Sequence, residues 1–278
     1  MSKIKAIENL FGFHPSTQGE FLFQHIARQF IPSEAKNQVY QLSHLQIGNR
    51  QDDLAEYYIG VYCFNLMARL VKKAVHLIED PAINQEQHQP QMKLYLQTQM
   101  EIAIDRQNKE GINKLISLSL SAAASSKKQV SQSAKLLVTP KYKPIYCYIC
   151  DRKLELSTDD TPTQVQYEHI WPRSFGGDST PENLLPACAH CNHEKGSTLL
   201  WQDAHVHSFV LRPSPTTEDL NKKIQYKVKI AMHRRNIFQR ACDDQITLKE
   251  AALKVGAMGK SIKYKHPDDA VDFFNCTI

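Results

Sequence analysis

Four of the seven cysteines stand in two identically spaced pairs, Cys147 with Cys150 and Cys188 with Cys191. Two intervening residues allow both sulfurs of a pair to turn toward one ion, and zinc favours soft sulfur ligands in a tetrahedral set. Four protein ligands leave no open position for a substrate or a reacting water. The spacing therefore predicts a structural zinc site that helps to fold a region with little core of its own.

The insert between the two pairs is longer than a minimal zinc ribbon needs, so it must hold something else. An acidic residue and a histidine come first, then a proline and a Gly-Gly turn, then an Asn-Leu pair. An asparagine, a lysine and a glycine follow the last cysteine. In order, these residues are Glu168, His169, Pro172, Gly176, Gly177, Asn183, Leu184, Asn192, Lys195 and Gly196. Together with the cysteines, they resemble the zinc-containing branch of the HNH, or ββα-metal, endonuclease family.

The resemblance implies a role for each matched residue. His169 takes the place of the general base that accepts a proton from the attacking water, and Glu168 that of the acidic ligand of a catalytic cation. Asn183 matches the residue that holds the loop and orients the base. Asn192 matches the third letter of the motif and would complete the cation site. The neighbouring His193 is an alternative for that position, but Asn192 is preferred because it follows the cysteine directly.

The chemistry of these side chains agrees with the implied roles. Cleavage of a phosphodiester requires an activated water and a cation near the scissile phosphate. An imidazole titrates near neutrality, and carboxylate and amide oxygens are hard ligands that suit Mg²⁺ or Mn²⁺. We therefore expect a structural Zn²⁺, a catalytic Mg²⁺ or Mn²⁺, and hydrolysis of nucleic acid, with DNA as the preferred substrate. Because neighbouring residues of a strand point to opposite faces, the strand must end or twist at Glu168 and His169.

Positive charge gathers toward the C-terminus. The chain has a formal net charge of +5, whereas residues 217–265 hold twelve Lys and Arg against five Asp and Glu. A solvated basic helix and a phosphate-contacting face both explain this segment. The residues that we expect at a nucleic-acid surface are Arg173, Lys195, Lys227, Arg234 and Arg235. For Lys195, a contact with phosphate and a simple cap at a helix end are equal alternatives.

The elements that must position these groups follow from apolar periodicity and turn residues. Helical spacing predicts helices over 53–80, 92–108 and 112–124, and a short helix near 130–137. A hairpin is expected around the first cysteine pair, a strand over 164–170, and a short helix that ends before Gly196. Two C-terminal helices follow, the second opened by a capping-box pattern of Thr247 with Glu250 and ending near Gly256.

These elements predict an α+β protein that is mostly helical and carries a small ββα-metal domain held by a four-cysteine zinc site. We expect a helical N-terminal domain over 1–124, a linker over 125–143, the HNH domain over 144–212 and a basic helical extension over 213–278. The sequence contains neither a long apolar run nor a signal-peptide pattern, which predicts a cytoplasmic protein.

Two other functions compete with a nuclease. The first is a non-catalytic zinc module that binds nucleic acid through the basic C-terminal helices. The second is an assembly component whose N-terminal helices dock a protein partner or a second copy of the chain. The layout, a small nuclease module within a longer helical chain, resembles HNH effectors of bacterial anti-phage defence or restriction systems. A nuclease of a mobile element is the alternative biological setting.

Overall fold

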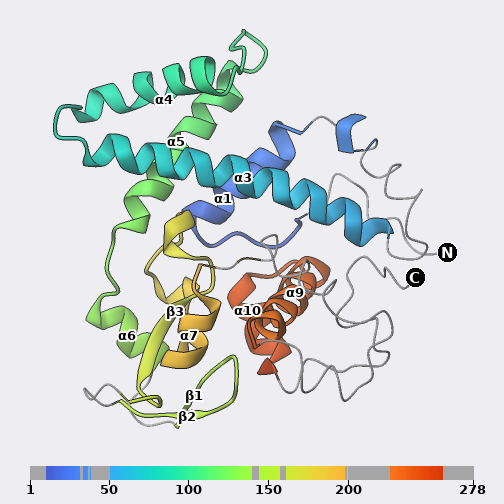
Figure 1. The fold of residues 1–278 in the computed structure, drawn as a ribbon, viewed down its shortest axis with the longest axis vertical. Helices are drawn as coiled ribbons and strands as arrows, with labels where there is room; N and C mark the ends of the chain where they lie inside the picture. The colour runs from blue at the N-terminus through green and yellow to red at the C-terminus, as the bar shows by residue number, and fades with distance from the viewer. Residues whose placement is uncertain are drawn as a thin grey trace.

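The computed structural model describes residues 11–31, 34–36, 38, 51–139, 144–156, 161–197, 199 and 226–258. It confirms a mostly helical chain with two small antiparallel sheets (Figure 1). The helices in chain order are α1 (Gln18–Gln29), α3 (Gln51–Glu79), α4 (Gln85–Gln99), α5 (Lys109–Ser126), α6 (Gln132–Val138), α7 (Ala189–Lys195), α9 (Tyr226–Asp244) and α10 (Leu248–Val255). The strands are β1 (Ile145–Tyr146), β2 (Lys153–Leu154), β3 (Val165–His169) and β4 (Leu184–Cys188).

Helices α1 and α10 each begin with a capping box. At α1 the Thr17 side chain accepts from the Glu20 N–H, and the Glu20 carboxylate accepts from the Thr17 N–H at 2.8 Å. Both side chains are buried, and burial raises the pKa of Glu20. At α10 the same reciprocal pair forms between Thr247 and Glu250, as the sequence predicts. Each box satisfies N–H groups that have no partner within their own helix.

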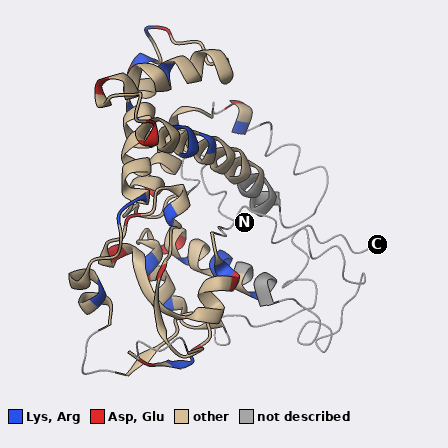
Figure 2. Ribbon diagram, turned by 60° about the vertical axis from the view of Figure 1, so that its left-hand side comes forward, with Lys and Arg blue, Asp and Glu red and all other residues tan. Residues whose placement is uncertain are grey.

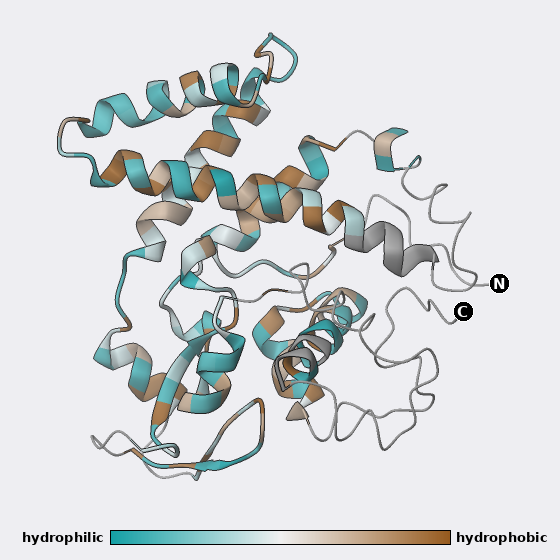
Figure 3. Cartoon of the chain, viewed as in Figure 1, coloured by the Kyte–Doolittle hydropathy of each residue, from teal (hydrophilic) through white to brown (hydrophobic). Residues whose placement is uncertain are grey.

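Helix α4 begins earlier than its apolar pattern predicts. The expected span was 92–108, but the helix runs from Gln85 to Gln99. Asn84 caps it together with Gln87. The helix is mostly hydrophilic (Figure 3), and its buried residues are Met92 and Leu96. A polar surface helix has few apolar residues from which a helical period can be recognised. The capping pattern of Asn84 with Gln87, in contrast, is visible in the sequence.

The two sheets lie at the end of the molecule away from α4 (Figure 1). Strands β1 and β2 form the expected hairpin around the first cysteine pair. Strand β3 pairs antiparallel with β4, with Val165 opposite Cys188 and His169 opposite Leu184. The sequence did not predict β4. Helix α7 follows β4 directly, so the second cysteine pair spans the junction of a strand and a helix.

One hydrophobic core joins the helices to the sheet region. The larger cluster contains residues of α1, α3, α4, α5, α9 and α10 together with Ile170, Trp171 and Leu185. Trp171 is 1% exposed, and its indole lies 5.6 Å from the Phe23 ring, centre to centre. A smaller cluster surrounds the cysteines and includes Ile145, Ile149, Leu154 and Ile230. The larger cluster contains residues from three of the four predicted regions. The domain boundaries at 124, 143 and 212 stay predictions.

The helices of the described part of the chain include none that combines the length and the apolar character of a membrane span.

Candidate active site and metal centre

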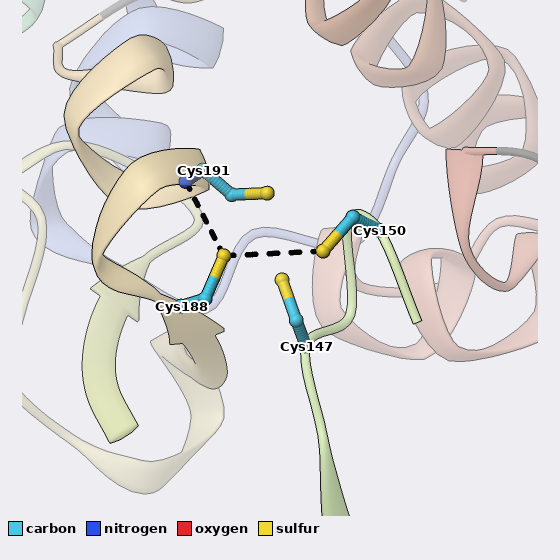
Figure 4. Close-up of side chains that lie close together, drawn as sticks. All are labelled: Cys147, Cys150, Cys188 and Cys191. Atoms are coloured by element: carbon cyan, nitrogen blue, oxygen red, sulfur yellow. Dashed lines mark hydrogen bonds between the residues drawn. The ribbon is translucent and has the colours of Figure 1, made fainter. Parts of the chain in front are cut away.

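The four paired cysteines converge. Their sulfur atoms all lie within 4.8 Å of one another, and three of the four residues are buried. Figure 4 shows Cys147 and Cys150 coming from the hairpin turn and Cys188 and Cys191 from the start of α7. Within the turn, the Asp151 N–H donates to the Cys147 carbonyl at 2.9 Å, and Asp151 itself has a φ of 63°. The donor set is the one that Zn²⁺ prefers in closed structural sites.

The thiols of this cluster differ in their readiness to ionise. Hydrogen bonding with Cys191 lowers the pKa of Cys147 to about 5, whereas burial raises the pKa of Cys150 to about 11. A cation at the centre of the cluster would supply the attraction that keeps all four sulfurs as thiolates, because a coordinated thiol is deprotonated by its metal. The cluster is therefore compatible with zinc.

Glu168 is buried, and both of its oxygens have protein partners. Its side chain is 2% exposed, and Oε2 accepts from the Tyr148 hydroxyl at 2.6 Å. Oε1 is paired with the ammonium group of Lys195, whose side chain is fully buried. Burial and the adjacent carboxylate raise the pKa of Tyr148 well above its usual value, and burial lowers that of Lys195 to about 8. Lys195 is thus enclosed by protein in this structure, and its contact with a phosphate stays a prediction.

Two buried cations also hold the backbone at the end of β3. Lys195 Nζ donates to the carbonyl of His169 at 3.0 Å, and Arg234 Nη2 donates to the carbonyl of Ile170 at 2.6 Å. Arg234 comes from α9 and is 6% exposed. Two consecutive carbonyls thus accept hydrogen bonds from side chains of α7 and α9, which fixes the backbone where β3 ends.

Asn192 faces the same strand from α7. Its amide nitrogen donates to Gln166 Oε1 at 2.6 Å. Gln166 and Glu168 are two residues apart and share a face of β3, and Asn192 and Lys195 are three residues apart on α7. The Asn192–Gln166 and Lys195–Glu168 contacts therefore lie side by side between β3 and α7. Glu168 and Asn192, the two expected cation ligands, share this interface.

The His169 ring has different partners. Its Nε2 lies 3.0 Å from Ser179 Oγ, and Ser179 Oγ donates to the carbonyl of Lys128 at 2.7 Å. Strand alternation accounts for this separation from Glu168, because β3 stays regular up to His169. Burial, together with the positive charges of Arg173 and Lys195, lowers the pKa of His169 to about 4. The ring is thus neutral at neutral pH, which is the form that can accept a proton.

Asn183 ties together the loop after His169. Its Oδ1 accepts from the Trp171 N–H at 2.8 Å, and its Nδ2 donates to the carbonyls of Trp171 and Asp178 at 3.0 and 2.9 Å. The side chain is 1% exposed. Gly176 within this loop has a φ of 82°, and a Cβ there would lie 2.5 Å from that of Ala122. Asn183 therefore has the position that holds the loop closed.

The remaining residues expected at a nucleic-acid surface belong to the loop after β3 and to α9. The Arg173 Nε donates to the carbonyl of Ser126 at 3.1 Å, so this side chain links the loop to the end of α5. Arg235 is partly exposed on α9, and the side chain of Lys227 lies outside the described residues. Figure 2 shows Lys and Arg spread over several helices of the chain. A contact of these residues with nucleic acid stays a prediction.

Sequence reasoning missed three partners of the site, Tyr148, Gln166 and Ser179. Tyr148 lies inside the first cysteine pair and Gln166 two residues before Glu168, so both could have been found from position alone. Ser179 follows the Gly-Gly turn, but nothing in its surroundings marks it as a partner of His169.

The comparison with known families decides what this segment is. Residues 147–202 match a family model described as HNH endonuclease. This segment is an HNH domain. The match begins at Cys147, the first of the four clustered cysteines, and contains Glu168, His169, Asn183 and Asn192. The resemblance to the HNH family that the sequence predicted is therefore confirmed. No curated protein matches the chain, and no solved structure does either. An HNH domain implies a nucleic-acid substrate and suggests nuclease activity.

Proposed function

We propose that the HNH domain is a divalent-metal-dependent endonuclease that hydrolyses DNA, with His169 as general base. The observation that carries this proposal is the set of hydrogen bonds at the His169 ring. The single proton of Ser179 Oγ goes to a carbonyl, which can only accept. Ser179 must then accept from Nε2–H of His169, and Nδ1 keeps a lone pair. That nitrogen accepts the proton of the attacking water.

Glu168 and Asn192 are the proposed ligands of the catalytic cation, Mg²⁺ or Mn²⁺, and the four cysteines those of a structural Zn²⁺. Oxygen donors from β3 and α7 in one interface support the first assignment. When bound, the catalytic cation supplies positive charge at the scissile phosphate. Lys195 now neutralises Glu168, so a cation must compete with its ammonium group for the carboxylate. Lys195 itself holds the His169 carbonyl and acts as a positioning residue.

The test is cleavage of supercoiled plasmid with Mg²⁺ or Mn²⁺, with a single-stranded RNA of the same length as a second substrate. His169→Ala should lower the cleavage rate by about 10²- to 10⁴-fold, which is the usual contribution of a general base. Its zinc content and thermal unfolding should stay as in the wild type. His76→Ala, an exposed histidine on α3, is the matched control and should cleave normally.

The second candidate function is a zinc module that binds nucleic acid without cutting it. The buried ion pair of Glu168 with Lys195 favours it, because a carboxylate already neutralised by a lysine is a poor cation ligand. Binding of plasmid by the wild type without metal-dependent cleavage would select this function. If His169→Ala still cleaves and His193→Ala does not, the general base is instead His193, an exposed histidine of α7. A role in anti-phage defence or restriction rests on the layout of the chain alone.

A further inference from the structure

A groove runs along one face of α1, outside the residues matched to the HNH family. Its main hollow has a volume of about 740 Å³. The α1 side chains that line it follow helical spacing, and α5 supplies the facing wall. The principal lining residues are Gln18, Phe21, His25, Arg28, Lys114 and Leu118. An adjoining hollow of about 820 Å³ shares His25, Gln29 and Lys114 with the first, so the two form one elongated groove.

The chemistry of the groove suits a polyanion with flat apolar parts. Arg28 and Lys114 bring fixed positive charge, and the main hollow has no Asp or Glu among its lining residues. Glu110 lines only the adjoining hollow, at the far end of α5. Phe21 is 44% exposed within this charged surface. Cations beside an exposed aromatic ring are the combination that binds the phosphates and bases of a single strand.

One end of the groove touches the loop of the HNH domain. The backbone N–H of Gln18 donates to Asp178 Oδ2 at 2.8 Å. Asp178 precedes Ser179, which is the partner of the His169 ring. The N–H of Gly19 also donates to the carbonyl of Gly176 at 2.9 Å. From this contact the twelve residues of α1 extend away for about 18 Å.

We infer that this groove holds a single-stranded stretch of nucleic acid that flanks the cleavage site, an inference that rests on the proposed function. Hollows of this size are typical of small-molecule sites and admit a few nucleotides. The bases of a duplex are paired and stacked inside it, so a base can stack on Phe21 only where the strands are separated. The groove then favours substrates with a single-stranded segment beside the scissile phosphate.

The test measures binding of a fluorescein-labelled oligothymidine by anisotropy, in the full-length His169→Ala protein and without added divalent ions. Arg28→Ala with Lys114→Ala should weaken binding about tenfold. It should also reduce the slope of log affinity against log salt by about 1.4, because two phosphate contacts are lost. Lys72→Ala with Lys93→Ala removes two exposed cations outside the groove and should change binding less than about twofold.

An uncharged pair of variants separates stacking from charge. Phe21→Ala should weaken oligothymidine binding about tenfold, whereas Tyr62→Ala, an exposed ring on α3, should leave it unchanged. Equal losses in the groove and control variants, or no loss in either, would overturn the inference. So would stoichiometric binding of ATP that Arg28→Ala with Lys114→Ala removes and oligothymidine does not displace, since the groove would then be a small-ligand site. Because no cleavage is measured, an inactive wild-type protein would refute the proposed function without changing these results.

Discussion

The two ends of the HNH domain are held in different ways. At one end the hairpin of β1 and β2 is held by four cysteines and a small apolar cluster. At the other end Trp171 is inserted among the helices of the N-terminal region, against Phe13 and Phe23. The first end depends on a cluster suited to metal, and the second on apolar packing. Strand β3, which carries Glu168 and His169, lies between them, so its geometry depends on both.

Removal of metal is expected to have the largest effect and to act on one end only. Structural zinc contributes about 10–16 kcal/mol in small zinc modules. A strong zinc chelator should therefore abolish the protection of β1, β2 and α7 in hydrogen–deuterium exchange, while α3 and α5 keep theirs. Chelator saturated with zinc beforehand is the control. Simultaneous loss of protection in α3 and α5 would show that the two ends are not distinct.

Truncation of Trp171 tests the other end. Trp171→Ala should lower the free energy of unfolding by about 3–5 kcal/mol, because it leaves a cavity among tightly packed rings. Thermal and chemical unfolding measure this loss, and zinc content should not change. Tyr62→Ala, at a half-exposed ring, should cost less than about 0.5 kcal/mol. If Trp171→Ala released zinc, the cysteine end would depend on the apolar end.

A smaller effect is expected from pH at the helix that covers the cysteine end. His233 of α9 is fully buried, and its Nε2 donates to the carbonyl of Gly256 at 2.7 Å. Burial, with Arg234 next to it, lowers the pKa of His233 to about 4, and Tyr148 packs beside its ring. The unfolded chain therefore binds the proton more readily than the folded one. Stability should fall by about 3 kcal/mol as pH decreases from about 6.5 to about 4.

The measurement is the free energy of unfolding across this pH range for the wild type and for His233→Gln, which cannot take up a proton. The variant should show a shallower pH dependence by the amount assigned to His233. Parallel profiles would assign the acid sensitivity to other groups, such as His25, whose pKa burial also lowers.

Local signals in the sequence were enough to find much of the site. Cysteine spacing predicted the cluster, the order of Glu168, His169 and Asn183 predicted the family, and Thr247 with Glu250 predicted the start of α10. Each of these signals lies within a few residues of what it predicts, or repeats a pattern with a known chemical reason. Capping boxes and metal-ligand spacing are local in this sense.

Contacts between distant segments could not be read in the same way. Strand β4 was missed because Pro186 lacks an N–H and argues against a strand; its carbonyl instead accepts from the Tyr148 N–H at 3.0 Å. The Ser179 contact with Lys128 and the Arg234 contact with Ile170 join positions 51 and 64 residues apart. Nothing in the local pattern of either partner encodes these pairings, because they depend on the packed arrangement of the helices.

The docking of Trp171 among the helices has a practical consequence for any attempt to excise the HNH domain. A fragment of residues 144–212 would present the bare indole and its apolar neighbours to water, along with loop groups that now bond to α1 and α5. Exposed apolar surfaces of that kind promote self-association. In this chain the helices cover that apolar surface of the HNH domain, and expression trials should keep them attached.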